Sequence, residues 1–189
     1  MRKGAVTQKN RFFLLIVLMT FLLSGCGYQI REAGTPVGIQ IQSLAIPMIS
    51  SSSSTLGFES EFTRQLRNEF IGHSRVPLVS ESGAYAVLKG NVYRISTEAL
   101  SYDVTKNIVQ GTETNYATTS SRRIRITLDM KLVERETGKV IWRDSRMEEK
   151  ASYAVGADPL QNMHEKKEAI REISRKLSRK IYAKTMERF

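Results

Sequence analysis

The chain has 189 residues, with 29 Lys and Arg against 19 Asp and Glu, and its formal net charge is +10. This length suggests one domain. The content of 41% hydrophobic and 25% charged residues is typical of a globular protein rather than a disordered or collagen-like one. A single cysteine and two histidines exclude an internal disulfide framework and any metal site built from several cysteines or histidines.

The N-terminal segment has the pattern of an export signal. Residues 1–11 carry four basic residues and no acid, and residues 12–23 form an apolar run of twelve residues. A helix that spans a membrane needs roughly 20 apolar residues, so this run is too short. Because residues 1–25 contain four basic residues and no acid, residues 26–189 carry a net charge of +6. Much of the high pI therefore belongs to the signal.

The signal ends in Leu23-Ser24-Gly25-Cys26, which resembles a bacterial lipobox and contains the only cysteine of the chain. The resemblance implies cleavage before Cys26 and a covalent lipid on the new N-terminus, whose several acyl chains hold a protein firmly at a membrane. Gly27 favours the outer membrane over retention at the inner one. We expect residues 26–189 to form one periplasm-facing, lipid-anchored domain without a nucleic-acid partner. The alternative is an ordinary signal peptide with a chance cysteine.

The first predicted elements after residue 26 are a strand and a helix. Apolar residues alternate with glutamines and then shift phase, which predicts a strand over 39–47 with a bulge near Gln42-Ser43. A helix is predicted over 58–71, and a short strand over 76–79. The prediction of this helix is based on four large apolar residues spaced four apart, and core packing is the favoured interpretation of them: Phe58, Phe62, Leu66 and Phe70.

A longer strand is predicted over 84–96, with apolar residues on both faces, which suggests a central strand covered at least partly on each side. Residues 96–121 hold ten Ser or Thr, and no proline. Because Thr and Tyr favour extended backbone, we expect two strand extensions that project beyond the core and meet at a turn near Lys106-Asn107. The alternative for this segment is a disordered loop.

The clearest alternation of the chain lies over 124–132, which predicts a strand with one buried and one solvated face. A tight turn over 136–139 and a returning strand over 140–146 follow. Asp158 and Pro159 suit the cap and first position of a last helix. Its apolar stripe is Ile170, Ile173, Leu177 and Ile181, and basic residues cover the rest.

This order of elements predicts an α+β fold: a two-layer sandwich with two helices on one face of a mainly antiparallel sheet of about four strands. The other face of the sheet would carry Thr127, Asp129 and Lys131.

The sequence contains no Gly-x-Ser-x-Gly, P-loop or dinucleotide fingerprint. We therefore expect neither an enzyme nor a cofactor or metal site, apart from the covalent lipid on Cys26.

Several features together resemble the LptE family of lipopolysaccharide-assembly lipoproteins. They are the Cys26-Gly27-Tyr28 start, a first strand ending at Ile46-Pro47, Leu88-Lys89-Gly90 in a later strand, the hairpin at Gly138 and the long C-terminal helix. The resemblance implies an outer-membrane lipoprotein that sits as a plug inside the LptD β-barrel, aids the folding of that barrel and binds lipopolysaccharide. The resemblance further implies that the pair inserts lipopolysaccharide into the outer leaflet.

The phosphates of lipid A, which divalent cations bridge, are natural partners for Arg and Lys. The candidate lipopolysaccharide-binding residues cluster around two predicted strands: Arg122, Arg123, Arg125, Lys139, Arg143, Arg146 and Lys150. A competing interpretation is another envelope lipoprotein that carries lipids or lipoproteins in an apolar cavity. The polar pattern of Thr127, Asp129 and Lys131 favours the plug.

Overall fold

The computed structural model describes residues 40–52, 58–109 and 112–186 of the chain. One sheet has the strand order β1-β3-β4-β5, and β2 also pairs with β3. β3, β4 and β5 are antiparallel neighbours, whereas the two short strands run parallel to β3. With its two helices this confirms the predicted α+β fold. The elements in chain order are β1 (Leu44–Ala45), β2 (Ser50–Ser51), α2 (Phe58–His73), a 3-10 turn η1 (Glu81–Gly83), β3 (Ala86–Val109), β4 (Thr112–Glu134), β5 (Val140–Ala154) and α3 (Pro159–Met186).

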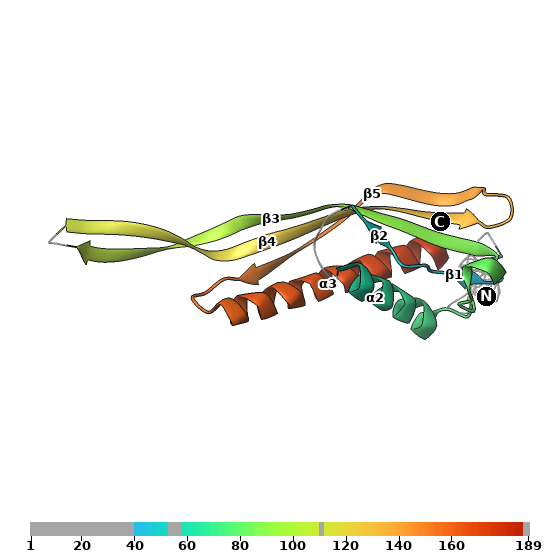
Figure 1. Ribbon diagram of the computed structural model, residues 1–189, viewed down its shortest axis with the longest axis horizontal. Coiled ribbons are helices and arrows are strands. Elements are labelled where there is room, and N and C mark those ends of the chain that lie inside the picture. The colour runs from blue at the N-terminus through green and yellow to red at the C-terminus, as the bar shows by residue number, and fades with distance from the viewer. Residues whose placement is uncertain (1–39, 53–57, 110–111, 187–189) are drawn as a thin grey trace, which may run out of the picture. The chain divides into compact units, whose positions relative to one another are not determined.

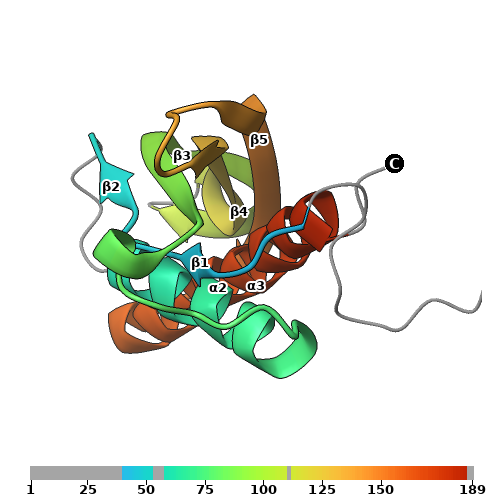
Figure 2. The ribbon, with the colours of Figure 1, turned by 90° about the vertical axis from the view of Figure 1, so that its right-hand side faces the viewer.

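Both helices lie against the same face of the sheet (Figures 1 and 2). The apolar stripe of α2 is fully buried, and so are Ile173, Leu177 and Ile181 of α3. They pack in one core cluster against alternate residues of β4. These β4 residues are all 0% exposed, as the alternation predicted: Ile124, Ile126, Leu128, Met130 and Leu132.

The segment between β1 and β2 closes one side of this core. Ile49 is buried, and its backbone N–H donates to Thr63 Oγ1 on α2 at 3.0 Å. Gly90 on β3 allows the close approach of its neighbours, because a Cβ at this position would overlap Met130 Sδ and meet Ile49 Cδ1 at 3.0 Å. The absence of a side chain at Gly90 is therefore a packing requirement of the core.

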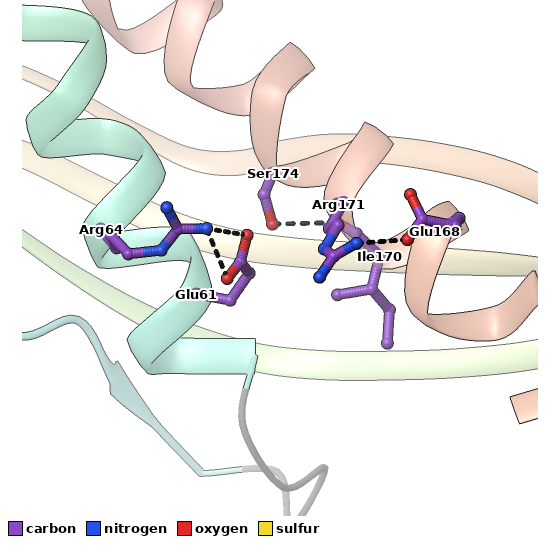
Figure 3. A network of polar contacts seen from close by, with 6 residues as sticks. All are labelled: Glu61, Arg64, Glu168, Ile170, Arg171 and Ser174. Atoms are coloured by element: carbon purple, nitrogen blue, oxygen red, sulfur yellow. Dashed lines mark hydrogen bonds and ion pairs between the residues drawn. The ribbon is translucent and has the colours of Figure 1, made fainter. Parts of the chain in front are cut away.

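The polar contacts of Figure 3 connect residues within each helix rather than between the helices. Arg64 Nη2 donates to Glu61 at 2.7 Å on α2, and Arg171 pairs with Glu168 on α3. Such exposed pairs contribute little to stability, so the two helices are held mainly by their buried apolar stripes. α3 begins as predicted, with Asp158 Oδ1 accepting a bond from the Leu160 N–H at 2.8 Å.

β3 and β4 continue beyond the end of β5 as a two-stranded ribbon (Figure 1). We define the ribbon as residues 101–109 and 112–121, since β5 ends at Ala154, the partner of Ser121. This confirms the expected strand extensions. The predicted turn at Lys106-Asn107 is wrong, because pairing continues to Val109 and Thr112. Two polar residues such as Lys106-Asn107 do not end the ribbon, because the Thr-rich strands on either side favour extended backbone and continue to pair.

Two predicted strands are shorter in the structure. The strand predicted over 39–47 pairs with β3 only at Leu44–Ala45, and of the predicted strand over 76–79 a single bridge remains, between Leu44 and Leu78. Pro47 has no N–H to donate to a ladder, so the chain leaves β3 there and pairs with it again as β2. The returning strand is longer than predicted, because β5 runs to Ala154.

β3 is covered on both faces only near its start. Val87 is buried on the far side of the sheet in a small cluster with Ala45 and Ala84. Beyond a bulge between Val92 and Arg94, the register places Ile95 opposite Ile126, on the helix side, while Tyr93 is 40% exposed. Regular alternation over the strand predicted at 84–96 would put Tyr93 and Ile95 on one covered face with Val87. That expectation is wrong, because a bulge moves the following residues to the other face.

Candidate functional site

The face of the sheet that carries no helix presents charged residues in cross-strand rows. As predicted, β4 places Thr127, Asp129 and Lys131 on this open face, with Arg123 and Arg125 further along. We call it the open face. It is the candidate functional surface, because it gathers most of the predicted basic residues.

Two arginines of the open face are already paired. Arg123 and Arg125 both lie 3.6 Å from Glu98 of β3, and Arg125 Nη1 also donates to Glu148 of β5 at 3.0 Å. These contacts join the three strands across the face. They place the guanidinium groups beside carboxylates of the neighbouring strands and offset part of their charge.

Arg143 of β5 makes the most complete ion pair of the face. Its Nε and Nη2 donate to the two oxygens of Asp129 at 3.0 and 2.5 Å. The hydrogen bond from Arg143 is the main reason that the pKa of Asp129 is lowered, against a smaller opposing effect of desolvation. Asp129 is therefore ionised at neutral pH, and Arg143 is engaged within the protein.

Three cations occupy one row of the open face. Lys131 lies opposite Lys89 on one side and opposite Arg143 on the other. Lys89 pairs with Glu81 at 3.0 Å and Arg143 with Asp129, whereas Lys131 has no carboxylate within 4.0 Å in the described part of the chain. Like charges placed directly opposite each other are unfavourable, so this row favours the approach of an anion.

The structure brings together only part of the predicted basic set. Arg122 lies on the helix side of the sheet, opposite Tyr153, and Lys139 lies in the hairpin turn before β5. Among the described residues, four side chains of the set have no carboxylate within 4.0 Å: Arg122, Lys139, Arg146 and Lys150. Cys26, the predicted lipidation site, lies outside the described residues.

Sequence reasoning missed Arg94, Tyr93 and Lys131 as candidates. Arg94 and Tyr93 line a depression on the open face that exists because β3 has a bulge there. The signal was present in the sequence, since the apolar positions of β3 change from even at Val92 to odd at Ile95. Lys131 could have been found from the alternation of β4 alone.

The outer edge of β5 is fastened to α3 rather than left open. Lys184 donates to Asp144 at 2.7 Å, and Lys180 pairs with Glu149 and also reaches the backbone oxygen of Glu148 at 3.4 Å. The alternation of apolar and basic residues in the last helix suggests that its basic residues form a solvated outer face, and for these two lysines that expectation is wrong. A charged side chain on an edge strand protects it from pairing with other strands.

Within residues 40–52, 58–109 and 112–186, no helix has the length and apolar character needed to cross a membrane, and no group of three or more His, Cys, Asp or Glu could hold a metal ion.

A family model described as "LptE: Lipopolysaccharide-assembly" matches residues 41–185, which is most of the chain. The chain belongs to the LptE family. Membership assigns it to lipopolysaccharide assembly, and the family is not one of enzymes. No curated protein matches the sequence.

Solved structures of other lipoproteins are similar to this chain at low identity. Lipoprotein B of Nitrosomonas europaea is 12% identical, with a TM-score of 0.44, and the match covers 82% of this chain and 88% of that chain. Rare lipoprotein B of Shewanella oneidensis is 14% identical, with a TM-score of 0.40 and coverages of 74% and 89%. A minor lipoprotein of Acinetobacter baumannii is 14% identical, with a TM-score of 0.42 and coverages of 78% and 92%. The assignment to the LptE family rests on the family match alone.

Proposed function

We propose that this LptE family member is an outer-membrane lipoprotein that sits as a plug inside an LptD-like β-barrel. In this role it aids the folding of the barrel, binds lipopolysaccharide and helps to deliver it to the outer leaflet. The family match over residues 41–185 carries the proposal. The lipobox supports the placement: residues 1–25 are the cleaved signal, and residues 26–189 are a periplasm-facing domain anchored through the lipid on Cys26.

The ribbon is the proposed contact with the barrel. A two-stranded ribbon is only marginally stable in water, and its exposed apolar residues include Tyr102, Val104 and Tyr116. Its sequence is rich in Ser and Thr, whose hydroxyl groups suit the polar interior of a large membrane barrel. A partner that surrounds the ribbon would supply the contacts that the helices give to the rest of the sheet.

The predicted basic residues are the proposed contacts with lipopolysaccharide. Arg and Lys can replace the divalent cations that bridge its phosphates, and Arg offers two parallel hydrogen bonds to one phosphate. Arg123, Arg125 and Arg143 are held by carboxylates on the open face. They would orient the ligand, while Lys139, Arg146 and Lys150 would meet its phosphates. Arg122, on the helix side of the sheet, would contact a different part of the ligand. No cofactor or metal is part of this proposal.

The charged rows of the open face also bear on the competing proposal of a lipid or lipoprotein carrier. A carrier needs an apolar surface to hold acyl chains. Here the helices cover the apolar face of the sheet, and Arg125, Asp129 and Lys131 occupy the other. The plug is therefore the favoured function.

Affinity capture tests the partnership with the barrel. The full-length lipoprotein is purified from detergent-solubilised membranes of its own cells, alongside a variant in which residues 104–117 are replaced by Asn-Gly. This replacement closes the ribbon at the Asp103 and Thr118 pair with a favoured hairpin turn. We expect a large barrel to co-purify with the unmodified chain and to be depleted with the shortened one.

A control variant carries Leu160→Ser and Met163→Ser, which change exposed apolar residues of α3 outside the ribbon. It should retain the barrel. Equal capture by the shortened and unmodified chains, with unchanged unfolding midpoints, would remove the ribbon from the interface. Absence of any barrel from all three would overturn the proposed partnership.

Binding of lipopolysaccharide is tested separately with Lys139→Gln plus Lys150→Gln. The matched control is Lys166→Gln plus Lys167→Gln, which removes the same charge from exposed positions of α3. We expect the first pair to retain less lipopolysaccharide in a pull-down assay than the control pair. Equal retention would remove Lys139 and Lys150 from the site.

A further inference from the structure

The open face is hollowed at one place where two strands depart from regular pairing. The depression has a volume of about 550 Å³ and is lined by Tyr93, Arg94, Thr127, Ser145, Arg146 and Glu148. Arg94, Thr127 and Glu148 form a single cross-strand row over β3, β4 and β5. We call this depression the bulge pocket.

Two β-bulges on either side of β4 create the bulge pocket. On β3, Tyr93 is the extra residue between the pairs of Val92 with Leu128 and Arg94 with Thr127. On β5, Ser145 and Arg146 together oppose one residue of β4. A bulge bends its strand and redirects side chains. Because both bulges flank Leu128, the sheet curves there and turns a tyrosine and two arginines toward the same space.

The bulge pocket is positively charged, and little of this charge is neutralised by neighbouring carboxylates. Neither Arg94 nor Arg146 has a side-chain ion pair within 4.0 Å among residues 40–52, 58–109 and 112–186. The one carboxylate in the lining, Glu148, already accepts a hydrogen bond from Arg125. Thr127 is only 6% exposed, so its side chain forms part of the floor.

We propose that the bulge pocket binds a phosphate monoester carried on a sugar. Arg94 on β3 and Arg146 on β5 lie on the two strands that flank β4. Their guanidinium groups suit the oxygens of one phosphate bound over β4, because each can donate two parallel hydrogen bonds. The phenol ring of Tyr93 offers a flat surface for the apolar side of a sugar ring, and the hydroxyl groups of Ser145 and Thr127 can pair with sugar hydroxyls. The volume is in the range of small-molecule sites.

This inference rests on the proposed function, because lipopolysaccharide is the ligand that would bring a phosphorylated sugar to this face. It adds a defined position and new residues, since Tyr93 and Arg94 were not in the basic set predicted from the sequence. Its test needs no barrel and no lipopolysaccharide, so the two proposals can fail independently.

Isothermal titration calorimetry on the full-length lipoprotein in detergent tests the bulge pocket. Three probes are titrated: glucosamine 1-phosphate, inorganic phosphate and glucosamine. We expect the sugar phosphate to bind most tightly and glucosamine not to bind. Arg94→Gln and Arg146→Gln should each weaken binding of the sugar phosphate about tenfold or more, since each removes a charge-assisted contact.

Two further variants separate specific contacts from general charge. Arg175→Gln removes one exposed guanidinium from α3, on the other side of the sheet, and should leave binding unchanged. Tyr93→Ala should weaken binding of the sugar phosphate and leave that of inorganic phosphate unaltered. Equal affinity for inorganic phosphate and the sugar phosphate would overturn the sugar assignment. No binding of the sugar phosphate, or equal losses in Arg94→Gln and Arg175→Gln, would overturn the pocket itself.

Discussion

Lys184 on α3 donates a hydrogen bond to Asp144 on β5, with its Nζ atom 2.7 Å from Oδ2. The same ammonium group lies 5.7 Å from the centre of the Trp142 ring. One side chain therefore fastens the last helix to two residues of the edge strand. The hydrogen bond from Lys184 is the main reason that the pKa of Asp144 is lowered, and desolvation opposes it.

The lowered pKa of Asp144 predicts a stability that depends on pH. Its folded-state pKa lies below the ordinary value of 3.8, so the carboxylate stabilises the fold above that value. This contribution is lost as the pH falls through the folded-state pKa. Asp144→Asn should cost about 0.5–1 kcal/mol at neutral pH, which is typical of a half-exposed pair. Urea unfolding should show the difference at neutral pH and almost none at a pH below both pKa values, whereas the same difference at both would contradict the prediction.

The buried hydrogen bond between Ile49 and Thr63 predicts an asymmetric pair of substitutions. Thr63→Val keeps the shape of the side chain but leaves the Ile49 N–H buried without its acceptor. We expect a loss of about 1–3 kcal/mol in the free energy of unfolding. Thr63→Ser retains the hydroxyl group and should lose less. Chemical denaturation of both variants checks this, and a valine variant as stable as the serine variant would show that the bond contributes nothing.

Close packing at Gly90 predicts that even a methyl group is unfavourable there. Gly90→Ala would overlap Met130 Sδ and press on Ile49, so we expect a cost of about 1–3 kcal/mol from overpacking. In a Met130→Ala background the same substitution should cost clearly less, because the overlapping side chain is gone. A double-mutant cycle measured by thermal unfolding gives the coupling. Independent effects of the two substitutions would contradict the packing argument.

β4 has a neighbouring strand on both sides over part of its length and on one side over the rest, which predicts different rates of amide hydrogen exchange along it. Residues Ile124 to Leu132 lie between β3 and β5, whereas residues 112–119 of the ribbon have partners in β3 only. Amides of Ala117 to Thr119 should therefore exchange much faster than those of the three-stranded part. Mass spectrometry of peptides from the unbound protein measures this. Ribbon peptides protected as strongly as Ile124 to Leu132 would contradict a marginally stable ribbon.

The periodic elements were predictable because each depends on neighbours in the sequence. Alternation over 124–132 places every second residue of β4 in the core, and the spacing of Phe58 to Phe70 places one side of α2 there. These two patterns predict a helix layer on one face and Thr127, Asp129 and Lys131 on the other. The lipobox at Cys26 is likewise a local pattern, and it predicts where the protein is anchored.

The candidate site was only half predictable, because its properties depend on cross-strand register. A shift of one residue exchanges the two faces of a strand, and the bulges at Tyr93 and at Ser145-Arg146 make such shifts locally. They decide that Arg94 joins Arg146. The position of Arg122 on the helix side follows instead from the alternation of β4 itself, since Arg122 is two residues before the buried Ile124.

The sequence by itself therefore determined the two layers and the charge of the open face, and it predicts the lipid anchor at Cys26, since all three follow from local patterns. Only the tertiary structure decided which cations are neutralised. Arg143 meets Asp129 and Lys184 meets Asp144, and these partners lie 14 and 40 residues apart in the chain. Long-range pairing of strands and the packing of α3 bring them together, and both depend on the folded core.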